Sequence, residues 1–180
     1  AGLSVGYHLA KRGLPFVILD ANDRIGGAWR NRWDSLRLFT PGRYSALPRM
    51  PFPGMPHAFP TKDEVADYIE AYAARFELPV RTGVRVDRLT RNGGRFELWA
   101  GERRFEADNV VVATGDLGVP HTPSIPLPVP ALHTSAYRNP DGLPSGAVLV
   151  VGAGPSGQQI ARELAGAGRR VHLAVGRHKA

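Results

Sequence analysis

A glycine-rich turn between an apolar segment and a helix is the strongest chemical signal in the sequence. Residues 147–151 are apolar, and the next six, Gly152-Ala153-Gly154-Pro155-Ser156-Gly157, have the spacing G-x-G-x-x-G. In this context the first glycine makes a tight turn, the second lets the backbone approach a pyrophosphate, and the third lets helix and strand pack closely. Free N–H groups at the helix start attract phosphate oxygens, and proline suits the first helical turn. We therefore predict a dinucleotide-phosphate site at Gly152, Gly154, Pro155, Ser156 and Gly157.

An internal repeat indicates a second site of the same kind. A shift of 155 residues places Gly2 on Gly157 and Gly13 on Gly168, and an apolar run follows in each copy. Each copy predicts a helix, a tight glycine turn and a buried strand of the parallel type. By this alignment Gly2 is the third glycine of a first motif. We therefore expect the chain to be a fragment that begins inside its own first phosphate loop; the alternative is that both turns only pack helices.

The two copies differ where they would meet a ribose. Asp20 ends the apolar run of the first copy, and a carboxylate there accepts hydrogen bonds from ribose hydroxyls. The same offset in the second copy falls on Val175, and Arg177 follows it. An arginine pairs with a 2′-phosphate that a carboxylate would repel. The first site therefore suits FAD and the second suits NADP(H); the alternatives are a turn-forming Asp20 and a solvated Arg177.

The segment after Asp20 could hold a flat ring. Gly26 and Gly27 permit a close backbone approach, and Trp29, Arg32 and Trp33 stand beside them. The alternative is a glycine turn with core tryptophans.

Further along the chain the sequence predicts helices and strands with a structural role. Residues 61–64 form a capping box before a helix, residues 78–107 read as short strands, and residues 110–113 read as a buried strand that ends in Thr114-Gly115.

We expect three parts in the chain. Residues 1–118 would form the FAD-binding domain, residues 119–146 a proline-rich crossover, and residues 147–180 the start of the NADP(H)-binding domain. His133 and Tyr137 lie in the crossover, where a histidine is more often a packing or surface residue than a catalyst.

Composition excludes several function classes. The net charge is +7, but the basic residues are scattered, so nucleic-acid binding is not expected. The chain has no cysteine, which argues against a disulfide scaffold, a Cys-ligated zinc site and a dithiol redox centre. We predict no metal site, no membrane span and, because no leader sequence is visible, a cytoplasmic location.

Taken together, the motifs resemble the class B flavoprotein monooxygenases, which include flavin-containing monooxygenases, YUCCA-type enzymes and Baeyer–Villiger enzymes. Six elements occur in the family's order: Gly2, Gly26-Gly27-Ala28-Trp29, the stretch 34–41 with the sequence DSLRLFTP, Ala113-Thr114-Gly115, the H-x-x-x-Y element from His133 to Tyr137, and Gly152 to Gly157. One departure is that Leu127 and Val129 occupy the phenylalanine and glycine positions of the family fingerprint.

The resemblance implies an α/β fold with two Rossmann-like dinucleotide-binding domains, both incomplete in this chain, and a small antiparallel β insertion. It implies that NADPH reduces FAD and that reduced flavin takes up O2. A C4a-(hydro)peroxyflavin would then transfer one oxygen atom to a small organic substrate. His133 and Tyr137 would act through domain organisation rather than as an acid or base. The FAD contacts it implies are Gly2, Asp20, Gly26, Gly27, Trp29, Arg32, Trp33, Thr40, Val84, Ala113, Thr114 and Gly115.

The sequence allows three alternatives to a monooxygenase to be compared. An NADPH-dependent flavoprotein that passes electrons elsewhere without oxygenation stays open, as does an inactive nucleotide-binding fragment. A two-dinucleotide disulfide reductase is disfavoured because no cysteine lies near the GG segment or before the second glycine motif. The sequence predicts neither the substrate nor the oligomeric state.

Overall fold

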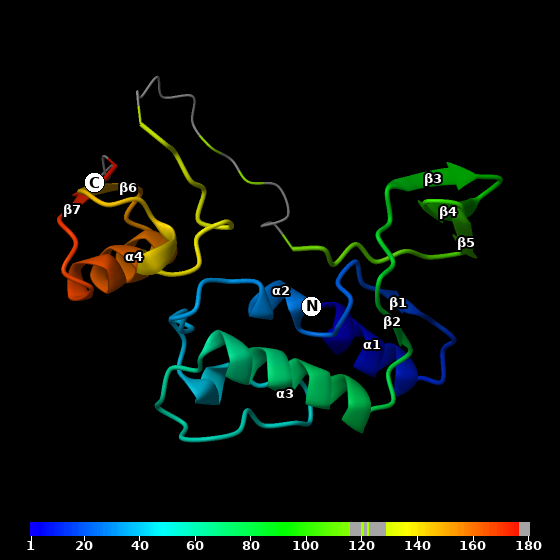
Figure 1. The fold of residues 1–180 in the computed structure, drawn as a ribbon. Coiled ribbons are helices and arrows are strands. Elements are labelled where there is room, and N and C mark those ends of the chain that lie inside the picture. The colour runs from blue at the N-terminus through cyan, green and yellow to red at the C-terminus, as the bar shows by residue number, and fades with distance from the viewer. Residues whose placement is uncertain (116–119, 121, 123–128, 177–180) are drawn as a thin grey trace. The chain divides into compact units, whose positions relative to one another are not determined.

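The computed structural model describes residues 1–115, 120, 122 and 129–176 (Figure 1). It divides into two compact units. The first comprises Ala1–Asn31 and Thr40–Val119, and the second comprises Arg32–Phe39 and Pro120–Ala180. The chain therefore enters the second unit briefly at residues 32–39 before it returns to complete the first.

The first unit begins with the first copy of the repeat. Helix α1 (Gly2–Ala10) leads through a glycine turn, with φ +64° at Gly13, into strand β1 (Ile18–Leu19). Strand β1 pairs in parallel with β2 (Val80–Arg81). Gly6 lies where α1 crosses β1, since a Cβ there would lie 2.7 Å from the Cδ1 of Ile18.

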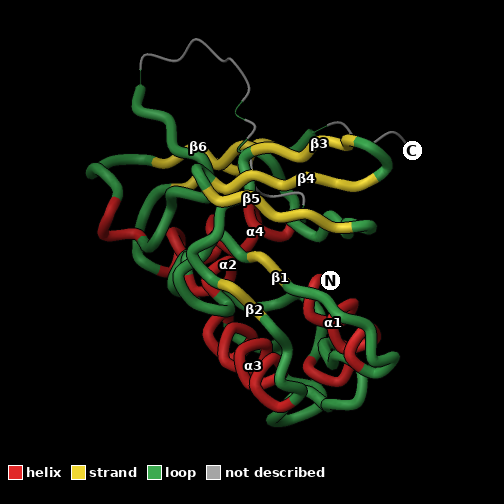
Figure 2. The backbone as a smooth tube through the Cα atoms, turned by 90° about the vertical axis from the view of Figure 1, so that its right-hand side faces the viewer, coloured by secondary structure: helices red, strands yellow, loops and turns green. Residues whose placement is uncertain are grey.

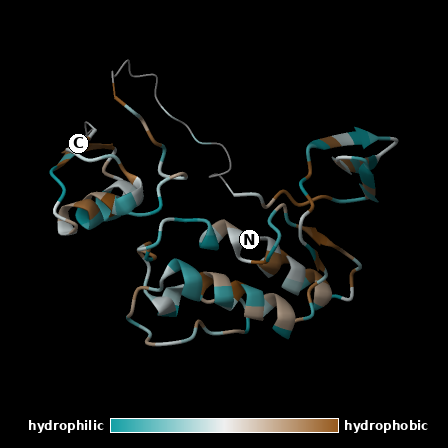
Figure 3. Ribbon diagram, viewed as in Figure 1, coloured by the Kyte–Doolittle hydropathy of each residue, from teal (hydrophilic) through white to brown (hydrophobic). Residues whose placement is uncertain are grey.

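Helix α3 (Lys62–Arg75) supplies most of the core of this unit. The predicted capping box is confirmed, because the Thr61 hydroxyl accepts from the backbone N–H of Glu64 and the Glu64 carboxylate accepts from the backbone N–H of Thr61. Hydrophobic and hydrophilic residues alternate along the helix (Figure 3). Its inner face is buried, as amphipathic spacing predicts. The core residues it contributes are Val65, Ala66, Tyr68, Tyr72 and Ala73.

A small antiparallel sheet is inserted after β2, as the sequence predicts. It consists of β3 (Arg88–Asn92), β4 (Arg95–Ala100) and β5 (Arg103–Ala107) in the order β3-β4-β5 (Figure 2). The turn at Gly93-Gly94 has positive φ at both residues, a conformation that favours glycine.

The expectation of a buried strand at residues 110–113 is wrong. Val111 is 62% exposed, Val112 is 70% exposed, and the segment pairs with no strand in the described part of the chain. A parallel-type strand becomes buried only when neighbouring strands and helices cover it. The apolar run is present, but within the described residues the neighbours that would bury it are absent.

The second unit contains the second copy of the repeat. Strand β6 (Val148–Val151) pairs in parallel with β7 (Val171–Ala174), and helix α4 (Pro155–Gly166) connects them. The glycine turn after α4 has φ +76° at Gly168, close to the value at Gly13, its counterpart in the first copy. The helix buries Ile160, Ala161 and Leu164. The predicted order of helix, glycine turn and strand is therefore confirmed in both copies.

Two short helices complete the first unit and one completes the second. They are α2 (Gly27–Arg30) and η1 (Gly42–Tyr44) in the first, and η2 (Pro140–Gly142) in the second. Within the described residues, no helix has the length and apolar character needed to cross a membrane.

Candidate functional site

The three glycines after β6 occupy three different environments. Gly152 has φ +101°, which makes the tight turn off the strand. A Cβ on Gly154 would meet no atom within 4 Å, so the space above this backbone is open. A Cβ on Gly157 would lie 1.9 Å from the carbonyl oxygen of Gly152 and 3.6 Å from Val150, so helix, loop and strand are packed closely. These are the three roles that a pyrophosphate-binding glycine motif requires.

The start of α4 supplies the groups that would meet phosphates. Gly154 is the N-cap and Pro155 occupies the first turn. The backbone N–H groups of the first turn have no intrahelical acceptor and carry the positive end of the helix dipole. Ser156, which is half-buried, follows directly. This geometry fits an anionic dinucleotide, while Arg177, the residue predicted to meet a 2′-phosphate, lies outside the described residues.

The H-x-x-x-Y element forms a loop that is bonded to α4. Tyr137 is 4% exposed, and its hydroxyl donates a 2.8 Å hydrogen bond to the Oε2 of Glu163 on α4. Burial, followed by this hydrogen bond, raises the pKa of the Tyr137 hydroxyl far above its usual value, so it remains a donor at all physiological pH values. Tyr137 therefore has a structural partner on α4. That it is neither an acid nor a base in the reaction stays a prediction.

His133 is oriented by its own loop. Its Nδ1 accepts a 3.2 Å hydrogen bond from the backbone N–H of Ser135 and lies 2.9 Å from the Ser135 hydroxyl. Because a backbone N–H can only donate, Nδ1 is the acceptor, and Nε2 carries the proton in the neutral ring. The donor Nε2–H is then the group that His133 offers to anything beyond its loop.

Residues 32–39, which we call the strap, belong to the same unit as α4. The backbone N–H of Asp34 donates to the carbonyl of Arg138, and the Asn139 side chain donates to the Asp34 carboxylate. Gln159 on α4 donates to the carbonyl of Arg37 at 2.8 Å and accepts from its N–H at 3.1 Å. The strap is therefore held from two sides within the second unit.

Two of the residues predicted to contact FAD, Arg32 and Trp33, lie on this strap. Trp33 is 4% exposed, and its indole Nε1–H is buried and has no hydrogen-bond partner in the described part of the chain. A buried donor without a partner costs about 1–3 kcal/mol. An acceptor supplied by a bound ligand would remove that cost.

In the first unit, Asp20 and Val84 lie together at the end of β1. The N–H of Val84 donates to the carbonyl of Asp20 at 2.9 Å, and the side chain of Val84 is buried. Asn22 donates to the Oδ1 of Asp20 from both its backbone and its side chain. Among the described residues Oδ2 has no hydrogen bond, so Asp20 shapes the turn through Oδ1 alone. Its predicted hydrogen bonds to ribose hydroxyls stay a prediction.

Two other predicted FAD contacts, Gly2 and Ala113, also lie close together. A Cβ on Gly2, at the start of α1, would lie 3.7 Å from the Cβ of Ala113. Gly115 follows with φ +75°, and Thr114 is exposed. The start of α1 and the A-T-G segment are therefore adjacent, which is the arrangement expected if both approach one dinucleotide.

The adjacent glycines 26 and 27 make close contacts within the protein. A Cβ on Gly26, where φ is +89°, would lie 2.8 Å from the carbonyl oxygen of Ala66 on α3. A Cβ on Gly27 would lie 2.6 Å from the Asn22 side chain. The close approach at this pair is therefore to helix and loop. Their predicted contact with FAD stays a prediction, as do those of Trp29, which is half-buried, and Thr40, whose hydroxyl lies 3.4 Å from Ser45.

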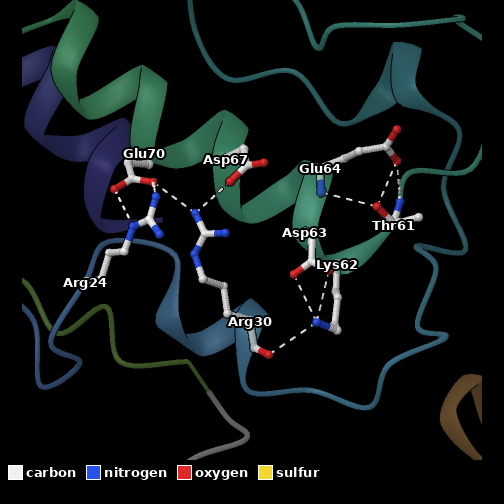
Figure 4. Close-up of polar contacts among 8 residues, drawn as sticks. All are labelled: Arg24, Arg30, Thr61, Lys62, Asp63, Glu64, Asp67 and Glu70. Atoms are coloured by element: carbon white, nitrogen blue, oxygen red, sulfur yellow. Dashed lines mark hydrogen bonds and ion pairs between the residues drawn. The ribbon is translucent and has the colours of Figure 1, made fainter.

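An ion-pair network fixes the glycine segment to α3 (Figure 4). Arg24 makes two 2.7 Å hydrogen bonds to the Glu70 carboxylate, and Arg30 bonds Asp67 and Glu70. The hydrogen bond from Arg24 lowers the pKa of Glu70 below its ordinary value. Two paired arginines on either side of Gly26-Gly27 thus hold α2 in place.

Sequence reasoning missed the polar residues that organise the second unit. Gln159 and Glu163 stand four residues apart on α4, so they lie on one face of the helix. Polar residues near a buried helix face were the only available signal, since their partners are more than twenty residues away in sequence.

Comparisons with known proteins agree with this architecture. The family model for pyridine nucleotide-disulphide oxidoreductases matches residues 1–180. An uncharacterized CzcO-like oxidoreductase of Geobacillus kaustophilus is 47% identical over 183 residues, which cover 99% of this chain and 52% of the relative. Indole-3-pyruvate monooxygenase YUCCA1 of Oryza sativa subsp. japonica is 33% identical over 188 residues, which cover 97% of this chain and 45% of the relative. A solved flavin monooxygenase from Stenotrophomonas maltophilia superposes with a TM-score of 0.90 at 35% identity, covering 99% of this chain and 55% of the other.

The chain spans about half the length of the curated relatives it matches. The relatives confirm the resemblance to flavin monooxygenases and YUCCA-type enzymes, and the superposition confirms the predicted fold class. Because the family model matches the whole sequence, the chain belongs to the pyridine nucleotide-disulphide oxidoreductase family.

Proposed function

We propose that the full-length protein is a flavin-dependent monooxygenase that uses FAD and NADPH to insert one atom of O2 into a small organic substrate. The observation that carries this proposal is the glycine geometry between β6 and α4. Gly152 turns, Gly154 leaves open space, and Gly157 packs helix against loop. The similarity to relatives that are named monooxygenases supports the oxygenation step.

The residues of this chain would bind and orient the two dinucleotides. Gly154, Pro155, Ser156 and the N–H groups of the first turn of α4 would hold the NADPH pyrophosphate, with Arg177 at the 2′-phosphate. The free oxygen of Asp20 would hold the FAD ribose. FAD, when bound, supplies the redox chemistry, and the protein contributes binding, orientation and exclusion of water.

The Trp33 indole N–H is a further group that fits a bound ligand, because it is buried and has no partner among the described residues. The remaining FAD contacts are proposed because the resemblance to the family implies them. They are Gly2, Gly26, Gly27, Trp29, Arg32, Thr40, Val84, Ala113, Thr114 and Gly115. A cytoplasmic location is likewise a prediction for the full-length protein.

Stopped-flow spectroscopy on the full-length protein tests the reaction. The FAD-loaded enzyme is reduced anaerobically with NADPH, with NADH as a comparison, and is then mixed with O2. A transient C4a-oxygen adduct before oxidised flavin returns is the expected result. Direct return to oxidised flavin would contradict oxygenation and favour an electron-transfer flavoprotein. Failure of NADPH to reduce the flavin would overturn the assignment of the second glycine motif.

The Gly154→Ala variant tests the nucleotide site without disturbing the fold. Its new methyl group meets no protein atom within 4 Å, so the fold should be unchanged. The methyl would, however, occupy the space through which a pyrophosphate approaches the backbone. We expect flavin content to be retained and reduction by NADPH to require at least about tenfold more nucleotide, equivalent to about 1.4 kcal/mol.

A further inference from the structure

Helix α4 carries two polar side chains that each reach a different distant segment. The side-chain amide of Gln159 donates from its nitrogen to the Arg37 carbonyl at 2.8 Å and accepts at its oxygen from the Arg37 N–H at 3.1 Å. Glu163, one turn later, accepts the Tyr137 hydroxyl at 2.8 Å. The strap and the loop of residues 133–139, which we call the fingerprint loop, are thus fastened to the same face of the same helix.

The two segments are also bonded to each other. The N–H of Asp34 donates to the Arg138 carbonyl at 2.8 Å, and Asn139 donates to the Asp34 carboxylate at 2.8 Å. The three contacts form a closed circuit of strap, fingerprint loop and helix. In a closed circuit, displacement of one member changes the bonds of the other two.

This circuit adjoins the proposed phosphate site. Helix α4 begins at Pro155, so Gln159 lies about 6 Å along the axis from the residue that opens the helix, at 1.5 Å per residue. The strap, which Gln159 bonds at Arg37, also carries Trp33, whose buried indole N–H has no partner within the residues that the structure describes. One short helix segment therefore joins the proposed phosphate site to the strap that carries Trp33.

We propose that Gln159 and Glu163 are positioning residues, which hold the strap and the fingerprint loop on α4 so that dinucleotide binding at the start of the helix is coupled to the placement of Trp33. This inference rests on the proposed nucleotide binding at Gly152 to Gly157. It assigns roles to two residues that belong to neither glycine motif.

The chemistry of each contact defines a conservative variant. Gln159 needs a donor and an acceptor at once, because it pairs with both the carbonyl and the N–H of Arg37. Gln159→Glu keeps the shape but loses the donor and sets a carboxylate against a carbonyl. Glu163→Gln keeps an oxygen that can accept the Tyr137 hydroxyl, whereas Glu163→Ala leaves that buried hydroxyl unpaired.

The experiment uses the FAD-loaded full-length protein and measures the Kd for NADP+, the flavin content and the exchange of the Asp34 and Arg37 amides. We expect Gln159→Ala, Gln159→Glu and Glu163→Ala each to weaken NADP+ about tenfold, within the usual range of coupling between sites. We expect Glu163→Gln to restore most of the affinity. Flavin content should stay near that of the wild type, because ten of the twelve predicted FAD contacts lie outside the strap.

Arg162→Ala is the matched control. Arg162 lies on α4 between the two positioning residues, is exposed, and makes no hydrogen bond or ion pair among the described residues. The NADP+ affinity of this variant should equal that of the wild type. Values for Gln159→Ala and Glu163→Ala within twofold of this control would overturn the proposal, and so would a parallel loss of FAD, which would indicate general destabilisation.

Amide exchange separates failure of this inference from failure of the proposed function. Gln159→Ala removes the acceptor of the Arg37 amide, and in a closed circuit Glu163→Ala should also accelerate exchange at Asp34. If the wild type does not bind NADP+, the nucleotide assignment fails, and faster exchange in both variants still supports the circuit. Unchanged exchange at the Asp34 and Arg37 amides would overturn the closed circuit, and with it this inference, whether or not NADP+ binds.

Discussion

Replacement of Gly157 by alanine tests the packing of the glycine-rich loop at residues 152–157 against α4. The added Cβ would lie 1.9 Å from the carbonyl oxygen of Gly152 and 3.1 Å from its carbonyl carbon. Both contacts are with backbone, so no side chain can rotate away. The oxygen and the methyl would have to separate by more than an ångström to reach any ordinary contact distance, which requires the loop to leave the start of the helix. Overpacking of this kind costs about 1–3 kcal/mol, occasionally more.

Thermal and urea unfolding of the full-length protein measure that cost directly. Gly166→Ala is the matched control, because Gly166 is the last residue of the same helix and its new Cβ would meet nothing within 4 Å. Alanine has a higher helix propensity than glycine, so this control should be neutral or stabilised by up to about 1 kcal/mol. The difference between the two variants isolates the clash from the effect of the residue type.

Nucleotide binding should distinguish a variant that disturbs the packing of the loop from one that only fills the space above it. Gly157→Ala displaces the loop and should lose both stability and NADP+ affinity, whereas Gly154→Ala should lose affinity alone. If Gly157→Ala unfolds at the same denaturant concentration as Gly166→Ala, the third glycine does not pack against the loop, and our account of the motif is wrong.

Three further predictions concern the first unit. Gly26→Ala should destabilise the protein by about 1–3 kcal/mol. Gly54→Ala has nearly the same positive φ but open space around it, so it should cost less because it lacks the clash with Ala66. Urea unfolding of the two variants compares the costs. Thr61→Ala should cost about 0.5–2 kcal/mol by loss of the cap, and Thr61→Ser should retain most of the stability. The pKa of the Glu70 carboxyl is lowered from 4.5, so its contribution to folding stability is present above about pH 4.5 and is lost as the pH falls through the folded-state pKa. The stability difference between the wild type and Glu70→Gln should therefore shrink in acid. Equal stability differences at pH 7 and pH 3 would contradict this.

The ion pair between Arg24 and Glu70 shows why such contacts escape sequence analysis. The two residues are 46 positions apart, and neither side chain is deeply buried. A charge on a helix surface has many possible partners, and only the path of the chain selects one. The Figure 4 network therefore had no signature in the sequence, although it fixes the segment that contains Gly26 and Gly27.

Local features could be predicted because their causes are local. The capping box at Thr61 and the positive φ at Gly13 and Gly168 depend on residues within one turn of the chain. The same holds for the order of strand, glycine turn and helix around Gly152, where the spacing of the glycines already specifies a turn, an approach and a packing contact. The sequence by itself therefore determined the repeat and the glycine-rich turn at residues 152–157.

Tertiary structure decided which neighbours each element has. The apolar run at 110–113 is exposed because burial of a strand depends on neighbouring strands and not on its own residues. Gly26 lies against Ala66, and the strap joins the second unit through Gln159, because contacts between distant segments depend on how the chain returns on itself. Residue type and spacing fix what a segment can do, whereas long-range packing fixes what it touches.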